Sequence, residues 1–110
     1  MAEAPDLLAA IDVGTNSLHL VIARLVGERF EVVSREKEMV RLGTGSGDMT
    51  ELTEDAIERG VACLARFKRL ADGAGAPLRA VATSAVREAA NHDVFLDRAR
   101  ADAGVEVEEA

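Results

Sequence analysis

The strongest constraint on the fold of this chain is an apolar segment that is interrupted by a short polar turn and then continues. Residues 7–13 and 18–25 are rich in aliphatic side chains, which predicts two neighbouring strands joined by that turn. The turn residues that offer hydroxyl, amide and backbone N–H donors are Gly14, Thr15, Asn16 and Ser17. A glycine allows a ligand to approach the backbone closely and takes dihedral angles that other residues resist. Two interpretations are open for this segment alone, a phosphate-holding loop or an ordinary hairpin turn.

The residue before this turn is a candidate metal ligand. Asp12 lies at the end of the first predicted strand. A carboxylate there can hold Mg²⁺ directly or through water, because hard cations prefer oxygen ligands. Phosphoryl chemistry needs both donors for the phosphate oxygens and a metal that neutralises charge. Asp12 and the polar turn together therefore supply the parts of a phosphate site.

A second polar segment follows a later strand. Residues 78–82 are a short aliphatic stretch, Thr83 and Ser84 come directly after it, and Arg87 lies within one further turn. A guanidinium group can bind phosphate oxygens through two parallel hydrogen bonds. The alternative for Arg87 is a surface ion pair with Glu88 or a neighbour, an interaction that contributes little. Two segments of this kind favour phosphate binding over a plain hairpin turn.

Together the two segments resemble the motifs of the exopolyphosphatase and guanosine pentaphosphate phosphatase family, within the actin-like ATPase folds. The first motif spans residues 11–23, and the second spans residues 82–89 with Asn91. The resemblance implies a hydrolase that uses Mg²⁺ and water to release the terminal phosphate of inorganic polyphosphate or the 5′ phosphate of guanosine pentaphosphate. It implies metal binding by Asp12. The phosphate-binding residues that it implies are Gly14, Thr15, Asn16, Ser17, Thr83, Ser84 and Arg87.

The chain has 110 residues, which is ordinary for one domain but short for this family. The resemblance implies two lobes with the substrate between them, so residues 1–110 are expected to be the N-terminal part of the first lobe. Three family elements are expected after Ala110, namely a Ser-Gly-x-x-Glu-Ala segment with the catalytic glutamate, an Asp-x-Gly-Gly-Gly-Ser loop, and the second lobe. Residues 105–108 fit the strand before that segment, so Glu108 and Glu109 are not expected to be the general base.

This expectation leaves two functional classes open. The whole protein is expected to be a phosphatase and, by the resemblance, a homodimer. The isolated 110-residue chain holds no expected catalytic residue and is predicted to be inactive. Its alternative role is that of a non-catalytic lobe that binds phosphate weakly or serves as an interaction piece. A sugar or acetate kinase of the same fold is the weakest alternative, because fold alone does not assign function.

Composition excludes several other classes. The net charge of −7 argues against nucleic acid or anionic membrane as partners, since such binding needs clustered lysine and arginine. No run approaches the length of a membrane span, and the N-terminus lacks the basic residues of a secretory signal, so a cytoplasmic protein is expected. The single cysteine, Cys63, is expected to pack as a small apolar side chain. Neither His19 nor His92 has converging ligand partners in the sequence, so neither is expected to bind a metal.

The predicted order of elements is three strands, a long helix, a strand, two helices and a strand. The first three strands (7–13, 18–25 and 30–42) are expected to form an antiparallel meander, with the first two buried as sheet core. Thr53 begins a helix whose apolar stripe would cover the sheet. The stripe consists of Ile57, Val61, Leu64, Phe67 and Ala71. Residues 43–48 are glycine-rich and are interpreted as a connector, with a second phosphate cradle as the alternative.

The remaining elements complete an α/β fold, a mixed sheet of the ribonuclease H-like kind. Helices are predicted over 85–90 and 91–103, and a fifth strand from Val105. A helical crossover would place the strand at 78–82 beside the strand at 7–13, so that both polar segments line one edge of the sheet. A sheet formed by this chain alone is also expected to keep an exposed edge and uncovered apolar faces.

Overall fold

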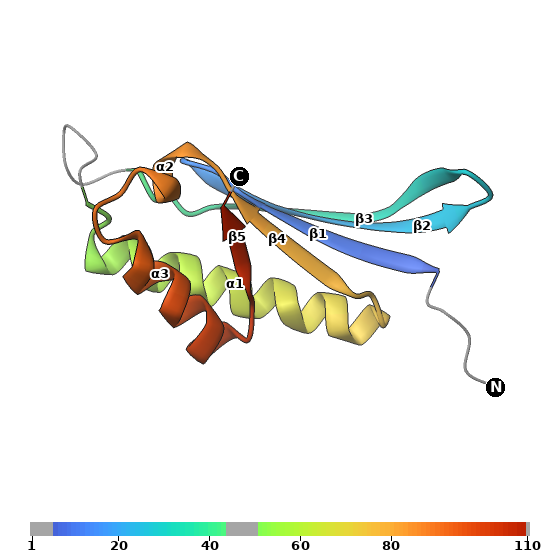
Figure 1. Ribbon diagram of the computed structural model, residues 1–110. Coiled ribbons are helices and arrows are strands. Elements are labelled where there is room, and N and C mark those ends of the chain that lie inside the picture. Colours follow the sequence, from blue (N-terminus) through green and yellow to red (C-terminus); the bar gives the residue numbers. More distant parts are fainter. Residues whose placement is uncertain (1–5, 44–50, 110) are drawn as a thin grey trace.

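The computed structural model describes residues 6–43 and 51–109, and it forms one five-stranded mixed sheet in the order β3-β2-β1-β4-β5 (Figure 1). The first three strands pair antiparallel, and β4 and β5 join them in parallel through helical crossovers. The strands are β1 (Leu7–Val13), β2 (Ser17–Val26), β3 (Arg29–Met39), β4 (Leu78–Ala82) and β5 (Val107–Glu109). The predicted meander and the predicted pairing of β4 with β1 are confirmed. The glycine-rich stretch from residue 44 to 48 lies outside the described residues.

The helices follow the predicted positions with shifted ends. They are α1 (Glu54–Ala74), α2 (Ser84–Arg87), α3 (His92–Arg98) and the π-helical turn η1 (Ala99–Ala103). Thr53 caps α1 by accepting a hydrogen bond from the Ala56 amide at 3.1 Å. The helix predicted over 85–90 is wrong in length, because α2 ends at Arg87 and a turn follows.

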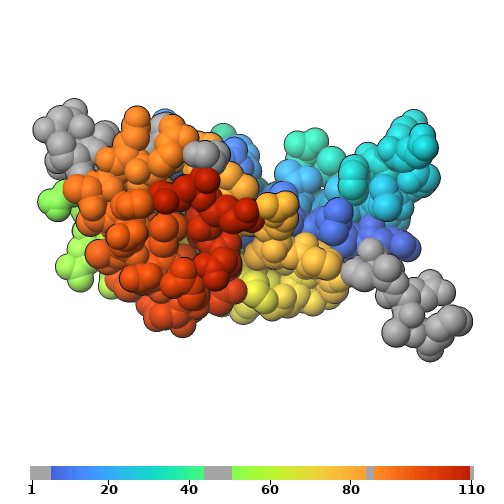
Figure 2. Space-filling view, in the orientation of Figure 1, coloured from blue at the N-terminus to red at the C-terminus, as the bar shows by residue number. Residues whose placement is uncertain are grey.

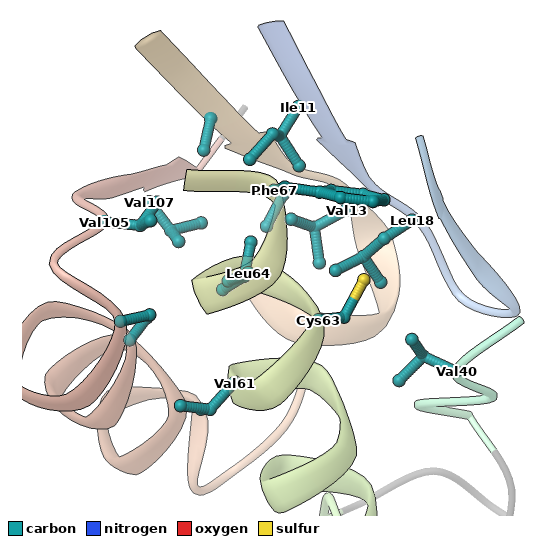
Figure 3. Packing of buried hydrophobic residues seen from close by; sticks show 14 of the residues in the cluster. Ile11, Val13, Leu18, Val40, Val61, Cys63, Leu64, Phe67, Val105 and Val107 are labelled. Carbon is teal, nitrogen blue, oxygen red and sulfur yellow. The ribbon is translucent and has the colours of Figure 1, made fainter. Parts of the chain in front are cut away.

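The core lies between α1 and one face of the sheet (Figure 3). Every residue of the predicted stripe is buried, and Phe67 and Leu64 lie beside Val13 and Leu18 from the first two strands. Cys63 is buried in the same layer, so its predicted apolar packing is confirmed. The long helix therefore holds the first two strands in place.

The opposite face of the sheet is uncovered in the described part of the chain. In β1, Ala9 and Ile11 are buried under α1, whereas Leu8 (44% exposed) and Ala10 point to the other side. The prediction that the first two strands are buried as sheet core is confirmed for one face only, because α1 and α3 lie on the same side of the sheet (Figure 1). The predicted uncovered apolar face is confirmed.

The hairpin of β2 and β3 extends beyond the helical layer (Figures 1 and 2). Phe30 near its tip is 57% exposed. At its other end, β3 stops at Met39 and not at Leu42 as predicted, because Arg41 adopts the left-handed conformation with φ of 58°. Val40 and Leu42 on either side of it are buried. This break directs residues 40–43 toward the polar turn between β1 and β2.

No helix in the ranges that the structure describes is long and apolar enough to cross a membrane.

Candidate functional site

The two polar segments singled out in the sequence meet at one edge of the sheet. β1 and β4 run parallel with Val13 opposite Ala82, so both strands end at the same level. The Thr83 amide donates to the Val13 carbonyl oxygen at 3.2 Å, and Thr83 Oγ1 lies 3.5 Å from the same oxygen. Segments 70 residues apart in the chain are thereby joined directly.

Gly14 closes the turn between β1 and β2 through its own backbone. Its φ is outside the left-handed region, so the prediction of an unusual dihedral angle is wrong. Its amide donates to the Ser17 carbonyl oxygen at 3.1 Å, which closes the turn. A Cβ atom at this position would lie 3.1 Å from that oxygen. The glycine is therefore explained by close backbone approach within the turn itself.

The carbonyl groups of the turn are held by residues 40–43. The Thr15 carbonyl accepts from the Gly43 amide at 3.0 Å, and the Asn16 carbonyl accepts from the amides of Val40 (2.9 Å) and Arg41 (2.7 Å). Because C=O and N–H point in opposite directions across a planar trans peptide, the Asn16 N–H points away from Gly43. Thr15 and Asn16 are exposed, and their amides donate to none of the described residues. These amides are therefore available to a ligand.

An arginine on α1 holds the same segment from its other side. Arg59 Nε donates to the Val40 carbonyl at 2.9 Å, and Nη2 donates to the Arg41 carbonyl at 3.3 Å. The two sequence motifs do not include Arg59. It lies 18 residues from Arg41, and nothing in its local sequence context distinguishes it from the other arginines of α1.

Asp12, the candidate metal ligand, is exposed on the uncovered face of the sheet. Its cross-strand neighbours are His19 on β2 and Val81 on β4. His19 Nε2 lies 3.1 Å from Ser17 Oγ, so this imidazole contacts the turn. No group of three or more His, Cys, Asp or Glu side chains converges in the described ranges. Asp12 could thus give Mg²⁺ one oxygen ligand, with phosphate oxygens and water as the others.

The second polar segment continues from Thr83 into α2. The Arg87 amide donates to the Thr83 carbonyl at 3.2 Å, and the Arg87 side chain is exposed. Ser84 begins α2, next to Thr83 in the backbone. The structure therefore brings the backbone positions of Thr83, Ser84 and Arg87 to the edge where the first turn lies.

Asn91 fixes the end of the second segment. Its side chain donates from Nδ2 to the Leu52 carbonyl at 2.9 Å and accepts at Oδ1 from the Leu52 amide at 2.8 Å. This pair of hydrogen bonds imitates the pairing of two strands. Asn91 therefore ties the chain before α1 to the chain before α3, a role that its motif position alone does not reveal.

Glu108 and Glu109, which were not expected to act as the general base, are bound by neighbouring side chains. Arg79 Nη2 lies 2.7 Å from Glu108 Oε1, and this hydrogen-bonded pair lowers the pKa of Glu108. His92 Nδ1 lies 2.7 Å from Glu109 Oε2, and the hydrogen bond raises the pKa of His92. Both glutamates lie in β5, as the strand interpretation requires.

Comparison with known proteins decides the family. Residues 21–108 match the Ppx/GppA phosphatase family. The chain belongs to this family. A guanosine-5'-triphosphate,3'-diphosphate pyrophosphatase from Photobacterium profundum is 40% identical over 103 residues, which is 93% of this chain and 21% of that protein. The Ppx/GppA chain thus spans about a fifth of the length of this curated relative.

Solved structures agree with this assignment. The crystal structure of an Aquifex aeolicus Ppx/GppA family member is similar with a TM-score of 0.89 at 32% identity, over 94% of this chain and 34% of that one. An exopolyphosphatase from Cytophaga hutchinsonii is similar with a TM-score of 0.89 at 34% identity, over 94% of this chain and 33% of that one. The predicted fold class, an actin-like ATPase lobe of the ribonuclease H-like kind, is confirmed.

Proposed function

We propose that this Ppx/GppA chain supplies one phosphate-binding side of a hydrolase cleft. The hydrolase would release the terminal phosphate of inorganic polyphosphate or the 5′ phosphate of guanosine pentaphosphate. One observation carries the proposal, namely the direct hydrogen bond from Thr83 to Val13 that brings both polar segments to one edge. The names of the relatives, a guanosine pentaphosphate pyrophosphatase and an exopolyphosphatase, support both substrates.

The chemistry of the residues at this edge suits a phosphoryl group. The amides of Thr15 and Asn16, which donate to none of the described residues, offer donors to phosphate oxygens. The hydroxyl groups of Thr15, Ser17 and Thr83 add further donors, and the guanidinium of Arg87 adds a charged donor that can bind two oxygens at once. The turn thus carries donors where negative charge on a phosphate must be stabilised.

Asp12 is the residue of this chain that would hold Mg²⁺, through its carboxylate oxygens. When bound, the ion would neutralise phosphate charge during transfer. A general base is needed to activate the attacking water, and we propose a glutamate from outside this chain for that role. Arg79 and His92 engage the two glutamates of β5, which supports this division of labour.

The alternative function, a non-catalytic lobe, is favoured by the fraction of the relatives that this chain spans, which is 21% for the Photobacterium protein. Phosphate release from polyphosphate by residues 1–110 alone tests it directly, and we expect no turnover.

A cytoplasmic location and a homodimer remain predictions from the family resemblance. Cell fractionation and analytical ultracentrifugation of the whole protein test them.

The proposed function is tested with the whole protein that contains this chain, assayed for phosphate release with Mg²⁺. Asp12→Asn and Thr83→Val are each expected to lower kcat/KM by about 100-fold, the usual size for losing one transition-state contact. Arg69→Ala is the matched control, because Arg69 is exposed on α1 and has no hydrogen bond or ion pair with a described residue. Full activity in both site variants, or no phosphate release by the unaltered protein, would contradict the proposal.

A further inference from the structure

Arg59 uses its guanidinium differently from the other arginines whose contacts are known. Arg66, Arg79, Arg98 and Arg100 form ion pairs with carboxylates. Arg59 instead donates to two consecutive backbone carbonyls, those of Val40 and Arg41. A planar guanidinium with fixed donor directions holds two such groups in one orientation. The side chain therefore fixes a piece of backbone.

We propose that Arg59 is a positioning residue that orients the amide donors of the first phosphate loop, an inference that rests on the proposed function. The connection runs through two sets of hydrogen bonds. Arg59 holds the carbonyls of residues 40 and 41, and the amides of residues 40, 41 and 43 hold the carbonyls of Thr15 and Asn16. Through residues 40–43, the orientation of Arg59 therefore fixes the orientation of the loop.

The backbone between these two sets of hydrogen bonds is strained at Arg41. Arg41 has φ of 58°, a conformation that a residue with a side chain adopts only when its surroundings impose it. Its amide is held by the Asn16 carbonyl at 2.7 Å, and its carbonyl is held by Arg59 at 3.3 Å. Without the arginine, the Arg41 peptide can relax toward an ordinary conformation, which would release the Asn16 carbonyl.

Buried side chains keep residues 40–43 in place independently of Arg59, so that Arg59 affects only the orientation of their peptide groups. Val40 and Leu42 are each 1% exposed, so apolar burial keeps residues 40–43 docked whatever the state of Arg59. The variant Arg59→Ala is therefore expected to fold. What it loses is the orientation of two peptide groups, and with it the direction of the Asn16 N–H. Small errors in donor placement lower the rate of a preorganised site strongly.

The test measures phosphate release from polyphosphate by the whole protein with Mg²⁺. Arg59→Ala is expected to lower kcat/KM by about tenfold or more, since two charge-assisted hydrogen bonds are lost. Arg59→Lys should retain only part of the kcat/KM that Arg59→Ala loses, because an ammonium group lacks the planar fork of donors. Guanidinium chloride at a few tens of millimolar should partly restore Arg59→Ala and should not restore Arg59→Gln, whose side chain fills the site. Arg69→Ala on the same helix is the control.

A second readout does not depend on activity. Hydrogen exchange at the amides of Val40, Arg41 and Gly43 is expected to quicken in Arg59→Ala and to stay unchanged in Arg69→Ala. If the unaltered protein releases no phosphate, the proposed function fails, and the exchange measurement still tests the inference. Unchanged exchange at the three amides would overturn it. A kcat/KM of Arg59→Ala within twofold of that of the unaltered protein would also overturn the inference. Unfolding of both Arg59→Ala and Arg59→Lys would overturn it as well, because the role of Arg59 would then be merely structural.

Discussion

The contact between α1 and the segment that supports the loop can be tested at Gly60. This residue lies in the middle of α1 and is buried. A Cβ atom there would lie 2.9 Å from Phe95 Cε1 and 3.1 Å from Leu42 Cδ2. Phe95 is fully buried, so its ring cannot turn aside without disturbing the core. The substitution Gly60→Ala must therefore displace the ring or the leucine.

The expected change in the free energy of unfolding for Gly60→Ala follows from two opposing effects. Alanine in a helix interior is favoured over glycine by about 1 kcal/mol. Overpacking a tight core costs about 1 to 3 kcal/mol. Gly60→Ala should thus lower the free energy of unfolding by about 1 kcal/mol. Gly73 on the same helix has no atom within 4 Å of an added Cβ, so Gly73→Ala should raise it by about 0.5 to 1 kcal/mol.

Native-state hydrogen exchange of the α1 amides measures this difference in a protein of any size. The two variants should differ by about 2 kcal/mol, which is about a 30-fold difference in the opening constant. Because Leu42 follows Arg41, Gly60→Ala should also quicken exchange at the amide of residue 43. Equal stability of the two variants would refute the close packing of α1 against Leu42 and Phe95.

Three further predictions concern Asn91, His92 and Cys63. Asn91→Ala removes both hydrogen bonds to Leu52 and should cost about 1 to 2 kcal/mol, seen as faster exchange of the Leu52 amide; unchanged exchange would contradict it. The hydrogen bond with Glu109 raises the pKa of His92 above 6.5, so its stabilisation is complete below pH 6.5 and disappears as pH rises through the folded pKa. NMR titration should show the raised pKa and its return toward 6.5 in Glu109→Gln; no change would contradict the pairing. Burial, with a smaller effect of the Glu38 charge, raises the pKa of Cys63 to about 12. Alkylation by iodoacetamide at pH 8 should therefore be much slower than in the unfolded chain, and equal rates would show that the thiol is accessible and ionises normally.

The sequence was sufficient for the elements with strong local signals. Thr53 as a helix cap and the apolar stripe of α1 predicted that helix, and the crossover rule predicted that β4 lies beside β1. Gly104 ends the last helical turn with φ of 69°, a left-handed conformation that glycine favours. The helix predicted over 91–103 is present, but its last turn is π-helical, a detail without a sequence signal.

Other features depend on contacts that no local pattern encodes. Ala10 and Val21 look like core residues, because apolar alternation cannot tell which face of a sheet the helices cover. An arginine with φ of 58° is not predicted by composition, because such conformations favour glycine and asparagine. The role of Arg59 in turn depends on that strained backbone. Tertiary hydrogen bonds therefore supply the part of the candidate site that the motifs leave out.

The central claim is that the two polar segments bind one phosphate ligand together. Hydrogen exchange of the whole protein with and without tripolyphosphate and Mg²⁺ tests it most directly. We predict slower exchange at residues 14–17 and 83–87 in the same titration, with one apparent affinity, and no change at the tip of the β2–β3 hairpin. Protection of only one segment, or two different affinities, would contradict a shared site.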